Sequence, residues 1–411
     1  MSEILTELPA YPMPRSASCP FDPPPDYRKL QTEAPITKVR LWDDSTAWLV
    51  TRYQDQRTLL ADQRISVDFM HPGYPHVTPG EASSTNAGAS KNRSRVFVSM
   101  DDPEHARIRR MVTAPFAIRR VEAMRPVIQR IVDGLIDDML AGPKPVDLVK
   151  AFALPVPSSV ICELLGVPYA EHEFFQRNSQ TIVNRGSSPV AVREARKSLE
   201  DYLEELIGEK LVHPADDLLS SLAAEQVATG ELTPRELATM GYFLLAAGHE
   251  TTANMIALGT LALLEHPDQL AELRQTDDPK LVAGAVDELL RYLNVLHMGR
   301  RRVALADIPI GDHVIKAGDG MILALDAGNR QDDVFANPDQ LDIHRDARRH
   351  LAFGFGVHRC LGGPLARVEL EVVYNTLYRR IPHLRLAVDI ADVPFKHDGL
   401  VYGVYELPVT W

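Results

Sequence analysis

One long apolar run constrains this chain more than any other feature of its sequence. Residues 237–264 are almost continuously apolar, and residues 233–236 (Thr-Pro-Arg-Glu) form a capping box with proline at the first helical position. A His-Pro pair at 266–267 ends the run. The pattern predicts a helix over 234–265, roughly 45 Å long at 1.5 Å per residue. Because a helix that is apolar on nearly all sides is buried, it should cross the centre of the protein.

The rest of the chain predicts a mainly α protein with small β-sheets. Alternating apolar residues at 36–41 and 47–51 predict short strands, and the C-terminal stretch VYGVYELPVTW is also β-like. The stretch from about 103 to 292 has mostly helical patterning. Residues 1–27 are rich in proline and are expected to form an extended arm on the surface. This leaves 28–411 as a single domain.

Residues 69–95 form a long segment with repeated Pro and Gly and several Ser and Asn, in which no helical or strand period survives. A loop of this length in a compact domain is usually a lid, a binding loop or disordered. We expect a substrate lid that orders over an apolar compound. A surface insertion without contact to a pocket is the alternative.

Charge and cysteine content narrow the classes of function. The chain has 44 Lys+Arg against 56 Asp+Glu, a net charge of −12, which argues against bulk binding of nucleic acid. Three cysteines are no disulfide framework and suit a reducing cytoplasm. The N-terminus lacks a signal-peptide pattern, and no uninterrupted apolar stretch reaches the ~20 residues of a membrane helix. We expect a cytoplasmic protein that binds neither nucleic acid nor membranes.

Cys360 lies in a glycine-rich segment whose composition suits a metal ligand. Residues 353–362 read Phe-Gly-Phe-Gly-Val-His-Arg-Cys-Leu-Gly, and the glycines let a backbone loop press flat against a ligand. An expected helix follows, whose free N–H groups can stabilise a thiolate, and a thiolate is an axial iron ligand that favours O–O cleavage. A buried, inert cysteine is the other interpretation, which we adopt for Cys19 and Cys162.

This segment matches Phe-Gly-x-Gly-x-His-x-Cys-x-Gly, the haem-binding signature of the cytochrome P-450 family, and so resembles that family strongly. The resemblance implies that Cys360 is the proximal ligand of the haem iron. It also implies that Phe353 shields the sulfur and that His358 contacts a haem propionate. Gly362 closes the motif and belongs to the same cofactor-binding segment.

Glu288 and Arg291 lie three residues apart on a second expected helix. Alone, this spacing predicts a surface ion pair worth at most ~0.5 kcal/mol. The pair is similar, however, to an invariant pair of the same family, which an arginine upstream of the cysteine loop completes. The matching residue is Arg345. The resemblance implies a structural triad that supports the haem loop without a role in catalysis.

Polar residues interrupt the long apolar helix at 247–252, Ala-Gly-His-Glu-Thr-Thr. Such side chains cost free energy there unless they are satisfied or useful, although threonines can bond back to the preceding turn and the Glu could be exposed. The segment resembles the oxygen-binding groove of the family. By that resemblance Ala247 and Gly248 border the haem, Gly248 leaves room for dioxygen, and Glu250 and Thr251 deliver protons. The other two polar residues receive no firm role.

Basic residues elsewhere are similar to the propionate contacts of the family. Residues 101–110 place acids before bases, as helix starts commonly do. The family has a like segment whose His and Arg meet the propionates, and those positions fall on His105 and Arg109. Arg302 matches a further propionate arginine, since the rigid fork of arginine suits carboxylates. The two arginines before it have no assigned role.

The resemblance runs from about Trp48 to the C-terminus and is to soluble bacterial members of the actinomycete type. It implies the triangular-prism fold, with haem b (iron protoporphyrin IX) between the long helix and the cysteine loop, and O2 as co-substrate. The implied enzyme is a monooxygenase that hydroxylates or epoxidises a largely apolar small molecule, a secondary metabolite or xenobiotic. Electrons would come from NAD(P)H through ferredoxin reductase and ferredoxin, and a monomer is expected.

Three other functions use the same iron ligand. A peroxide-driven peroxygenase usually lacks the acid–alcohol pair, so Glu250 and Thr251 count against it. A non-redox isomerase needs the same ligand set. A haem-based gas sensor or carrier without turnover would explain Cys360 but not the polar segment of the long helix. Substrate-dependent consumption of NAD(P)H separates this last reading from a monooxygenase.

Family position alone assigns the contacts with substrate and redox partner, and the compound itself is not predicted. The expected substrate contacts are Phe69, Met70, Val77, Leu245, Ala246, Val295, Leu296, Met298, Leu400 and Val401. An acidic ferredoxin is expected to dock on the cysteine side, where several arginines concentrate in the sequence. These are Arg107, Arg109, Arg110, Arg119, Arg120 and Arg359.

Overall fold

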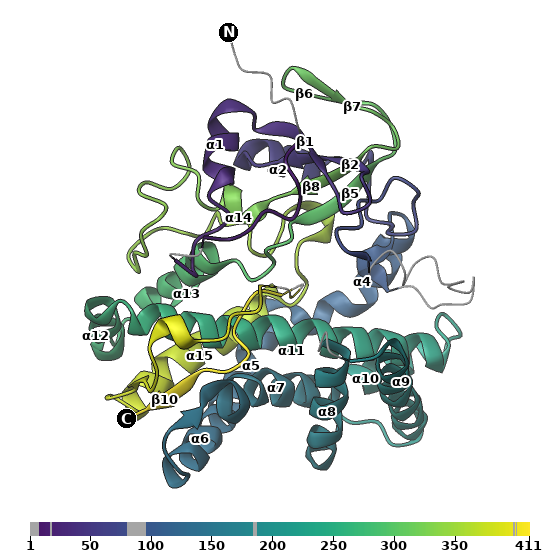
Figure 1. Ribbon diagram of the computed structural model, residues 1–411. Coiled ribbons are helices and arrows are strands. Elements are labelled where there is room, and N and C mark those ends of the chain that lie inside the picture. The colour runs from purple at the N-terminus through teal and green to yellow at the C-terminus, as the bar shows by residue number, and fades with distance from the viewer. Residues whose placement is uncertain (1–7, 17–18, 80–95, 184–186, 398, 400) are drawn as a thin grey trace. The chain divides into compact units, whose positions relative to one another are not determined.

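The structure is a computed structural model that describes residues 8–16, 19–79, 96–183, 187–397, 399 and 401–411. The chain divides into two compact units, whose helices and strands are labelled in Figure 1. Unit 1 comprises Met1–Arg107 and Asp287–Cys360, and unit 2 comprises Ile108–Val286 and Leu361–Trp411. A single domain over 28–411 stays a prediction. The mainly α architecture with small sheets is confirmed.

A five-stranded sheet with strand order β1-β2-β8-β5-β3 lies in unit 1. Its strands are β1 (Ile36–Arg40), β2 (Thr46–Val50), β3 (Ile65–Ser66), β5 (Arg300–Ala304) and β8 (Gly320–Leu323). β2 and β8 run parallel, and the other neighbours are antiparallel. Successive residues enter opposite apolar clusters: Val50 and Met321 belong to one, Leu49 and Ile322 to the other. Apolar clusters therefore cover both faces of this sheet, and the strands expected at 36–41 and 47–51 are confirmed.

Short helices and a hairpin complete unit 1. The helices are α1 (Asp26–Glu33), α2 (Tyr53–Leu60) and α14 (Leu325–Gly328), and the hairpin strands are β6 (Ile308–Ile310) and β7 (His313–Ile315). Ile310 pairs with His313, so the hairpin loop has two residues, and Gly311 begins it with φ of +53°. Two-residue hairpin turns need a positive φ at this position, which glycine adopts without strain.

In the described part of the N-terminal arm, buried side chains alternate with exposed ones, and its place on the surface stays a prediction. Tyr11, Met13 and Phe21 are buried, and the first two share an apolar cluster with Leu49. The Tyr11 N–H also donates to the Arg40 carbonyl at 2.9 Å, beside β1. Proline content suggested a surface arm, but the aromatic side chains between the prolines gain free energy from burial.

The long helix of unit 2, α11 (Pro234–Leu264), is confirmed together with its capping box. Every residue from Thr252 to Leu263 is buried. The helix packs along α7 (Pro155–Leu165), α9 (Pro189–Val212) and α15 (Gly363–Arg380), as Figure 1 shows. A Cβ on Gly259 would lie 1.9 Å from the hydroxyl of Tyr374 on α15, so glycine permits this close approach. The Tyr374 hydroxyl in turn donates to the Met255 carbonyl at 2.6 Å.

The remaining elements are shorter. The other helices are α4 (Glu104–Thr113), α5 (Ile118–Ala123), α6 (Arg125–Ala141), α8 (His172–Val183), α10 (Leu218–Leu222), α12 (Pro267–Gln275) and α13 (Pro279–Leu293). A three-stranded sheet in unit 2 has the order β4-β10-β9, from β4 (Val146–Asp147), β9 (Arg385–Leu386) and β10 (Pro408–Thr410). Short 3-10 and π turns lie at Phe97–Ser99, Ala114–Phe116, Val149–Ala153, Tyr169–Glu171, Ala223–Val227, Gly356–His358 and Ile390–Asp392.

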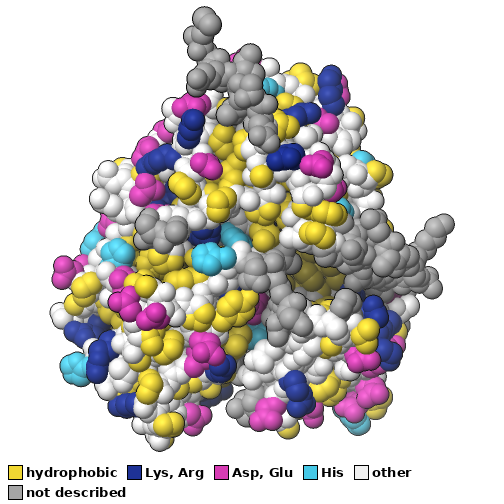
Figure 2. Space-filling view, viewed as in Figure 1, with side chains coloured by type: hydrophobic (Ala, Val, Ile, Leu, Met, Phe, Trp, Pro, Cys, Tyr) yellow, Lys and Arg dark blue, Asp and Glu magenta, His cyan; other side chains and the backbone are white. Residues whose placement is uncertain are grey.

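Three further expectations can be compared with the structure. The first part of the expected lid, residues 69–78, forms turns and bends without helix or strand, and 80–95 lies outside the described residues. None of the helices described is both long and apolar enough to span a membrane. On the face drawn in Figure 2, acidic and basic side chains are interspersed, without a continuous basic area.

Candidate functional site

The segment from Phe353 to Cys360 folds into a tight loop of unit 1. The Cys360 N–H donates to the Phe353 carbonyl at 2.8 Å, which closes the loop. Gly354 and Gly356 have φ of +70° and +73°, in the left-handed region that favours glycine. A Cβ on Gly356 would lie 2.2 Å from the Leu60 carbonyl oxygen, so this glycine also lets the loop lie against the end of α2. Backbone conformation and close packing therefore explain why glycine occupies positions 354 and 356.

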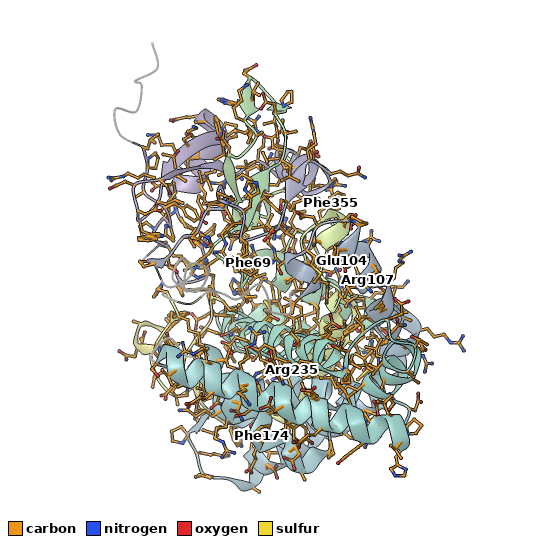
Figure 3. All side chains as sticks on the ribbon, turned by 90° about the vertical axis from the view of Figure 1, so that its right-hand side faces the viewer. Phe69, Glu104, Arg107, Phe174, Arg235 and Phe355 are labelled. Carbon is orange, nitrogen blue, oxygen red and sulfur yellow. The ribbon has the colours of Figure 1, made fainter. Side chains whose placement is uncertain are left out.

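Aromatic contacts and a helix start surround this loop. The Arg57 guanidinium lies 4.4 Å from the ring centroid of Phe355, a residue labelled in Figure 3, and the Phe353 ring lies 5.5 Å from His350. α15 begins three residues after Cys360, with Gly362 as its N-cap. The free N–H groups at a helix start favour a negative charge nearby, and the thiolate expected at Cys360 stays a prediction.

The other two cysteines have a different environment. Burial raises the pKa of the Cys162 thiol to about 12, and burial also raises the pKa of Cys19. Cys162 is buried in α7, whereas Cys360 is exposed. Since the thiolate is the form that binds metals, a protonated Cys162 is inert. The structure agrees with the prediction that Cys162 is a core side chain.

His105, at the start of α4, has a nitrogen atom that the described protein does not satisfy. The side chain is buried, its Nδ1 lies 3.0 Å from the Asp102 carboxylate, and its ring centroid lies 4.0 Å from that of His358. The Nε2 atom is buried without a hydrogen-bond partner among the described residues. An unsatisfied buried donor costs about 1–3 kcal/mol. An Nε2–H at this position would be available to a further carboxylate, which fits a haem propionate.

The two arginines assigned to the propionates differ in position. Arg302 is a β5 residue, and burial, followed by the charge of Arg300, lowers its pKa to about 10. Its guanidinium donates to the neutral Arg301 carbonyl at 2.7 Å. Arg109 is half-buried and lies one turn after His105 on α4. A desolvated guanidinium bonded to a neutral acceptor is suited to receive a carboxylate.

Glu288, Arg291 and Arg345 meet in the interior of unit 1. The Glu288 carboxylate accepts two hydrogen bonds of 2.7 Å from Arg291, and both side chains are fully buried. Arg345 Nε donates to the same carboxylate at 3.1 Å. Arg291 also donates to the carbonyls of Asn329 and Pro338 at 2.9 and 2.8 Å. The isolated surface ion pair is thereby excluded, because this charged network is buried and ties α13 to the segment before the cysteine loop.

Glu250 of α11 is buried within a polar cluster of unit 2. Its Oε1 accepts hydrogen bonds from Lys396 Nζ at 2.7 Å and from Asn254 Nδ2 at 2.9 Å. Burial raises the pKa of Glu250, but Lys396, Asn254 and His249 outweigh it, so the pKa falls below its ordinary value. Burial lowers the pKa of His249 and keeps that ring neutral. The expectation of an exposed Glu as the alternative reading is therefore wrong, and the carboxylate is ionised and held.

Gly248 and Thr251 lie close to Glu250 on α11. The Thr251 hydroxyl donates to the Ala247 carbonyl at 2.8 Å, which is the back-bonding considered as an alternative. Its oxygen can still accept a hydrogen bond. A Cβ on Gly248 would meet only the Ile161 side chain, at 3.8 Å. Packing within unit 2 does not require a glycine there, so the room it leaves is available to a ligand.

The residues expected to touch substrate fall into three groups. Val77 and Met298 are buried in the apolar cluster of Leu49, and their contact with substrate stays a prediction. Leu400 lies outside the described residues. The other expected contacts differ in exposure: Met70 is exposed, Leu245 and Val295 are buried, and Phe69, Ala246, Leu296 and Val401 are intermediate. Phe69 is labelled in Figure 3.

Sequence reasoning missed two partners of Glu250. Asn254 follows it by four residues, so the spacing of a helix would have predicted that contact. Lys396 is 146 residues away in a segment without regular structure. The sequence holds no local signal for that pair, which depends on how the C-terminal segment meets α11.

The chain is similar to known proteins in both sequence and structure. The sequence model of the family described as Cytochrome P450 matches residues 189–384. Cytochrome P450 GfsF of Streptomyces halstedii is 56% identical over 98% of this chain and 97% of its own length. The GfsF crystal structure has a TM-score of 0.92 and covers 98% of this chain and 100% of that one.

Two further relatives carry descriptions of a reaction. The 20-oxo-5-O-mycaminosyltylactone 23-monooxygenase of Streptomyces fradiae is 43% identical over 98% of this chain and 92% of its own. The structure of the mycinamicin VIII C21 methyl hydroxylase MycCI from Micromonospora griseorubida, bound to mycinamicin VIII, is 41% identical with a TM-score of 0.89. It covers 98% of this chain and 100% of that one. The chain therefore belongs to the cytochrome P450 family and is a haem-thiolate monooxygenase of the actinomycete type.

Proposed function

We propose that this monooxygenase hydroxylates or epoxidises a bulky, largely apolar secondary metabolite, with electrons from a ferredoxin and its reductase. The relatives named for 20-oxo-5-O-mycaminosyltylactone and mycinamicin VIII support this class of substrate. Foreign apolar compounds are the second candidate. The observation that best supports oxygen activation is the buried, ionised Glu250 beside the Thr251 hydroxyl, on a largely apolar helix.

In this proposal unit 1 supplies the iron ligand and the residues that hold the haem carboxylates. Cys360 binds the iron through its thiolate, and His105, Arg302 and His358 bind the propionates. Arg109, on the other part of α4, adds a fourth hydrogen-bond donor. Haem held by a thiolate supplies dioxygen binding and cleavage of the O–O bond. The buried Glu288 network keeps the strand of chain before Cys360 fixed, and takes no part in the reaction.

Unit 2 supplies the proton delivery of this proposal. A carboxylate whose pKa lies below its ordinary value accepts a proton reluctantly, so Glu250 must loosen its bond to Lys396 before it can carry one. Thr251 lies next along the helix. Because the Thr251 hydroxyl donates its proton to the Ala247 carbonyl, its oxygen is left to accept a hydrogen bond from a protonated group at the site. Neutral His249 is a packing residue in this scheme.

The test is turnover by the purified holoenzyme under two supplies of oxidising equivalents. With NAD(P)H, a surrogate ferredoxin and its reductase, we expect product in proportion to the NAD(P)H consumed in the presence of substrate. Turnover that runs equally fast on hydrogen peroxide alone would identify a peroxygenase instead. Binding of oxygen without any product would identify a carrier or sensor.

Two spectra test the ligand and the substrate class. Cys360→Ala should lose the red-shifted thiolate band of the ferrous–CO complex, and persistence of that band would contradict the assignment of Cys360. A titration of the haem spin state with a panel of bulky and smaller apolar compounds should show binding by the bulky ones. Equal response across the panel, or a response to polar compounds alone, would argue against the proposed substrate class.

A further inference from the structure

The arginine at position 300 has no role in the function described so far, and its position on β5 gives it one. Side chains two residues apart on a strand point to the same face, so Arg300 and Arg302 share one face and Arg301 occupies the other. Arg301 indeed lies over the Tyr74 ring, 5.8 Å from its centroid. Arg300 lies opposite Leu323 and Arg302 opposite Met321 on β8, and β3 pairs on the other side with the next two residues, Val303 and Ala304. The two guanidiniums therefore project from a rigid base.

The electrostatic surroundings of this pair are unbalanced. Burial lowers the pKa of both Arg300 and Arg302, and the charge of Arg300 lowers the pKa of Arg302 further. Both side chains are only partly accessible to solvent. Two like charges on one desolvated face repel each other, and the protein must offset that cost.

Carboxylates of the described residues do not offset it. Neither arginine forms an ion pair within the part of the chain that the structure describes, and Arg302 donates to a neutral carbonyl. Asp101 acts on Arg302 at longer range, but its oxygens accept from the Ser66 hydroxyl at 2.6 Å and the Val67 N–H at 2.9 Å. The face thus holds more positive charge than its surroundings neutralise, in the same unit as the unsatisfied Nε2 of His105.

We propose that Arg300 is a further carboxylate-binding residue of this enzyme, which together with Arg302 holds the two carboxylates of the haem from one face of β5. The inference rests on the proposed haem site. It adds a second β5 guanidinium to the residues already assigned to the propionates, so that each carboxylate can meet an arginine of this strand. A guanidinium can bind a carboxylate through two parallel hydrogen bonds, which a lone histidine cannot.

The same chemistry would also suit an acidic substrate, and the experiment separates the two sources. The holoenzyme is compared with Arg300→Gln, Arg300→Lys and, as the matched control, Arg301→Gln on the opposite face of the same strand. The first readout is the rate of haem transfer to excess apomyoglobin. We expect about tenfold faster transfer from Arg300→Gln, the equivalent of about 1.4 kcal/mol, and a rate within about twofold of the parent from Arg301→Gln.

The second readout is the haem reduction potential without substrate. Removing a positive charge disfavours uptake of an electron, so the potential should fall in Arg300→Gln and stay near the parent value in Arg300→Lys. Equal haem transfer and potential in Arg300→Gln and the parent would overturn the inference, as would equal changes in Arg300→Gln and Arg301→Gln. If Arg300→Gln does not fold, Arg300→Lys decides, since loss of the fork alone should still speed haem transfer.

A titration with dodecanoate and dodecanol completes the test. Haem loss that is unchanged in Arg300→Gln, together with a lost preference for dodecanoate, would assign the guanidinium to a substrate carboxylate and overturn the inference. A parent protein that binds no haem would overturn the proposed function as well. A parent with normal haem, and an Arg300→Gln variant that matches it, would overturn this inference alone.

Discussion

Replacing Glu288 with glutamine should destabilise this protein far more than the loss of one ordinary ion pair. The substitution keeps the shape of the side chain but removes its charge. In the parent, the carboxylate faces two guanidiniums, Arg291 at 2.7 Å and Arg345 at 3.1 Å, and it also accepts from the Asp342 N–H at 3.0 Å. Arg291 is fully buried, so its charge would remain without a counter-charge in the interior.

The expected size of the effect follows from this burial. Burial lowers the pKa of Arg291 and Glu288 opposes that fall, which reflects how strongly the guanidinium depends on the carboxylate. Removing one partner of a buried pair typically costs about 3–5 kcal/mol. With a urea slope of about 3 kcal/mol per molar, the unfolding midpoint should fall by about 1 M or more. The carbonyls of Asn329 and Pro338 still accept from Arg291, which keeps the loss near the lower end.

The chain contains its own control for this measurement. Glu104 and Arg107 on α4 form a pair with the same three-residue spacing, at 2.8 Å, but their side chains are 55% and 38% exposed (Figure 3). Glu104→Gln should change the free energy of unfolding by no more than about 0.5 kcal/mol. Urea unfolding of both variants is followed by circular dichroism and by haem absorbance. A midpoint for Glu288→Gln that matches that of Glu104→Gln would refute the argument from burial.

Three further outcomes follow from the site. Thr251→Ala should keep haem and substrate binding but release reduced oxygen as hydrogen peroxide, and equal product per NAD(P)H in variant and parent would contradict its role. Lys396→Met removes the main group that lowers the pKa of Glu250, so burial should raise that pKa in the variant. In the parent, the ion pair stabilises the folded protein above the ordinary carboxyl pKa, and this stabilisation is lost as pH falls. The variant should instead lose stability as pH rises. First-electron transfer from an acidic ferredoxin should slow as salt rises, because the Debye length is only ~8 Å at physiological ionic strength. It should also slow when the charges of Arg110 and Arg359 are reversed. A rate independent of salt would count against docking of the ferredoxin on the cysteine side.

The sequence predicted most where local patterns decide the structure. The capping box and the apolar run gave α11 to within one residue, since both depend on residues close in the chain. The strands near residues 36 and 47 followed from alternation in the same way. Proline content did not predict which side chains of the N-terminal arm are buried, because the burial of Tyr11 and Met13 depends on a sheet formed by distant segments.

In the candidate site, too, contacts between residues close in the chain were easier to predict than contacts between distant residues. The three-residue spacing predicted the Glu288–Arg291 ion pair, whereas the family resemblance predicted its third member, Arg345, and the role of Cys360, which stays a prediction. Neither gave an account of Lys396, which reaches Glu250 from 146 residues away.

A buried acid nevertheless requires a partner, because an isolated charge in an apolar helix would cost several kcal/mol. The polar interruption at 247–252 could therefore have predicted that a cation arrives from elsewhere in the fold, although not which one. That partner also changes the chemistry, because an acid held by lysine transfers protons only as fast as the pair opens. In the proposed function, proton delivery would therefore require the Lys396–Glu250 pair to open, in addition to the two residues of the motif.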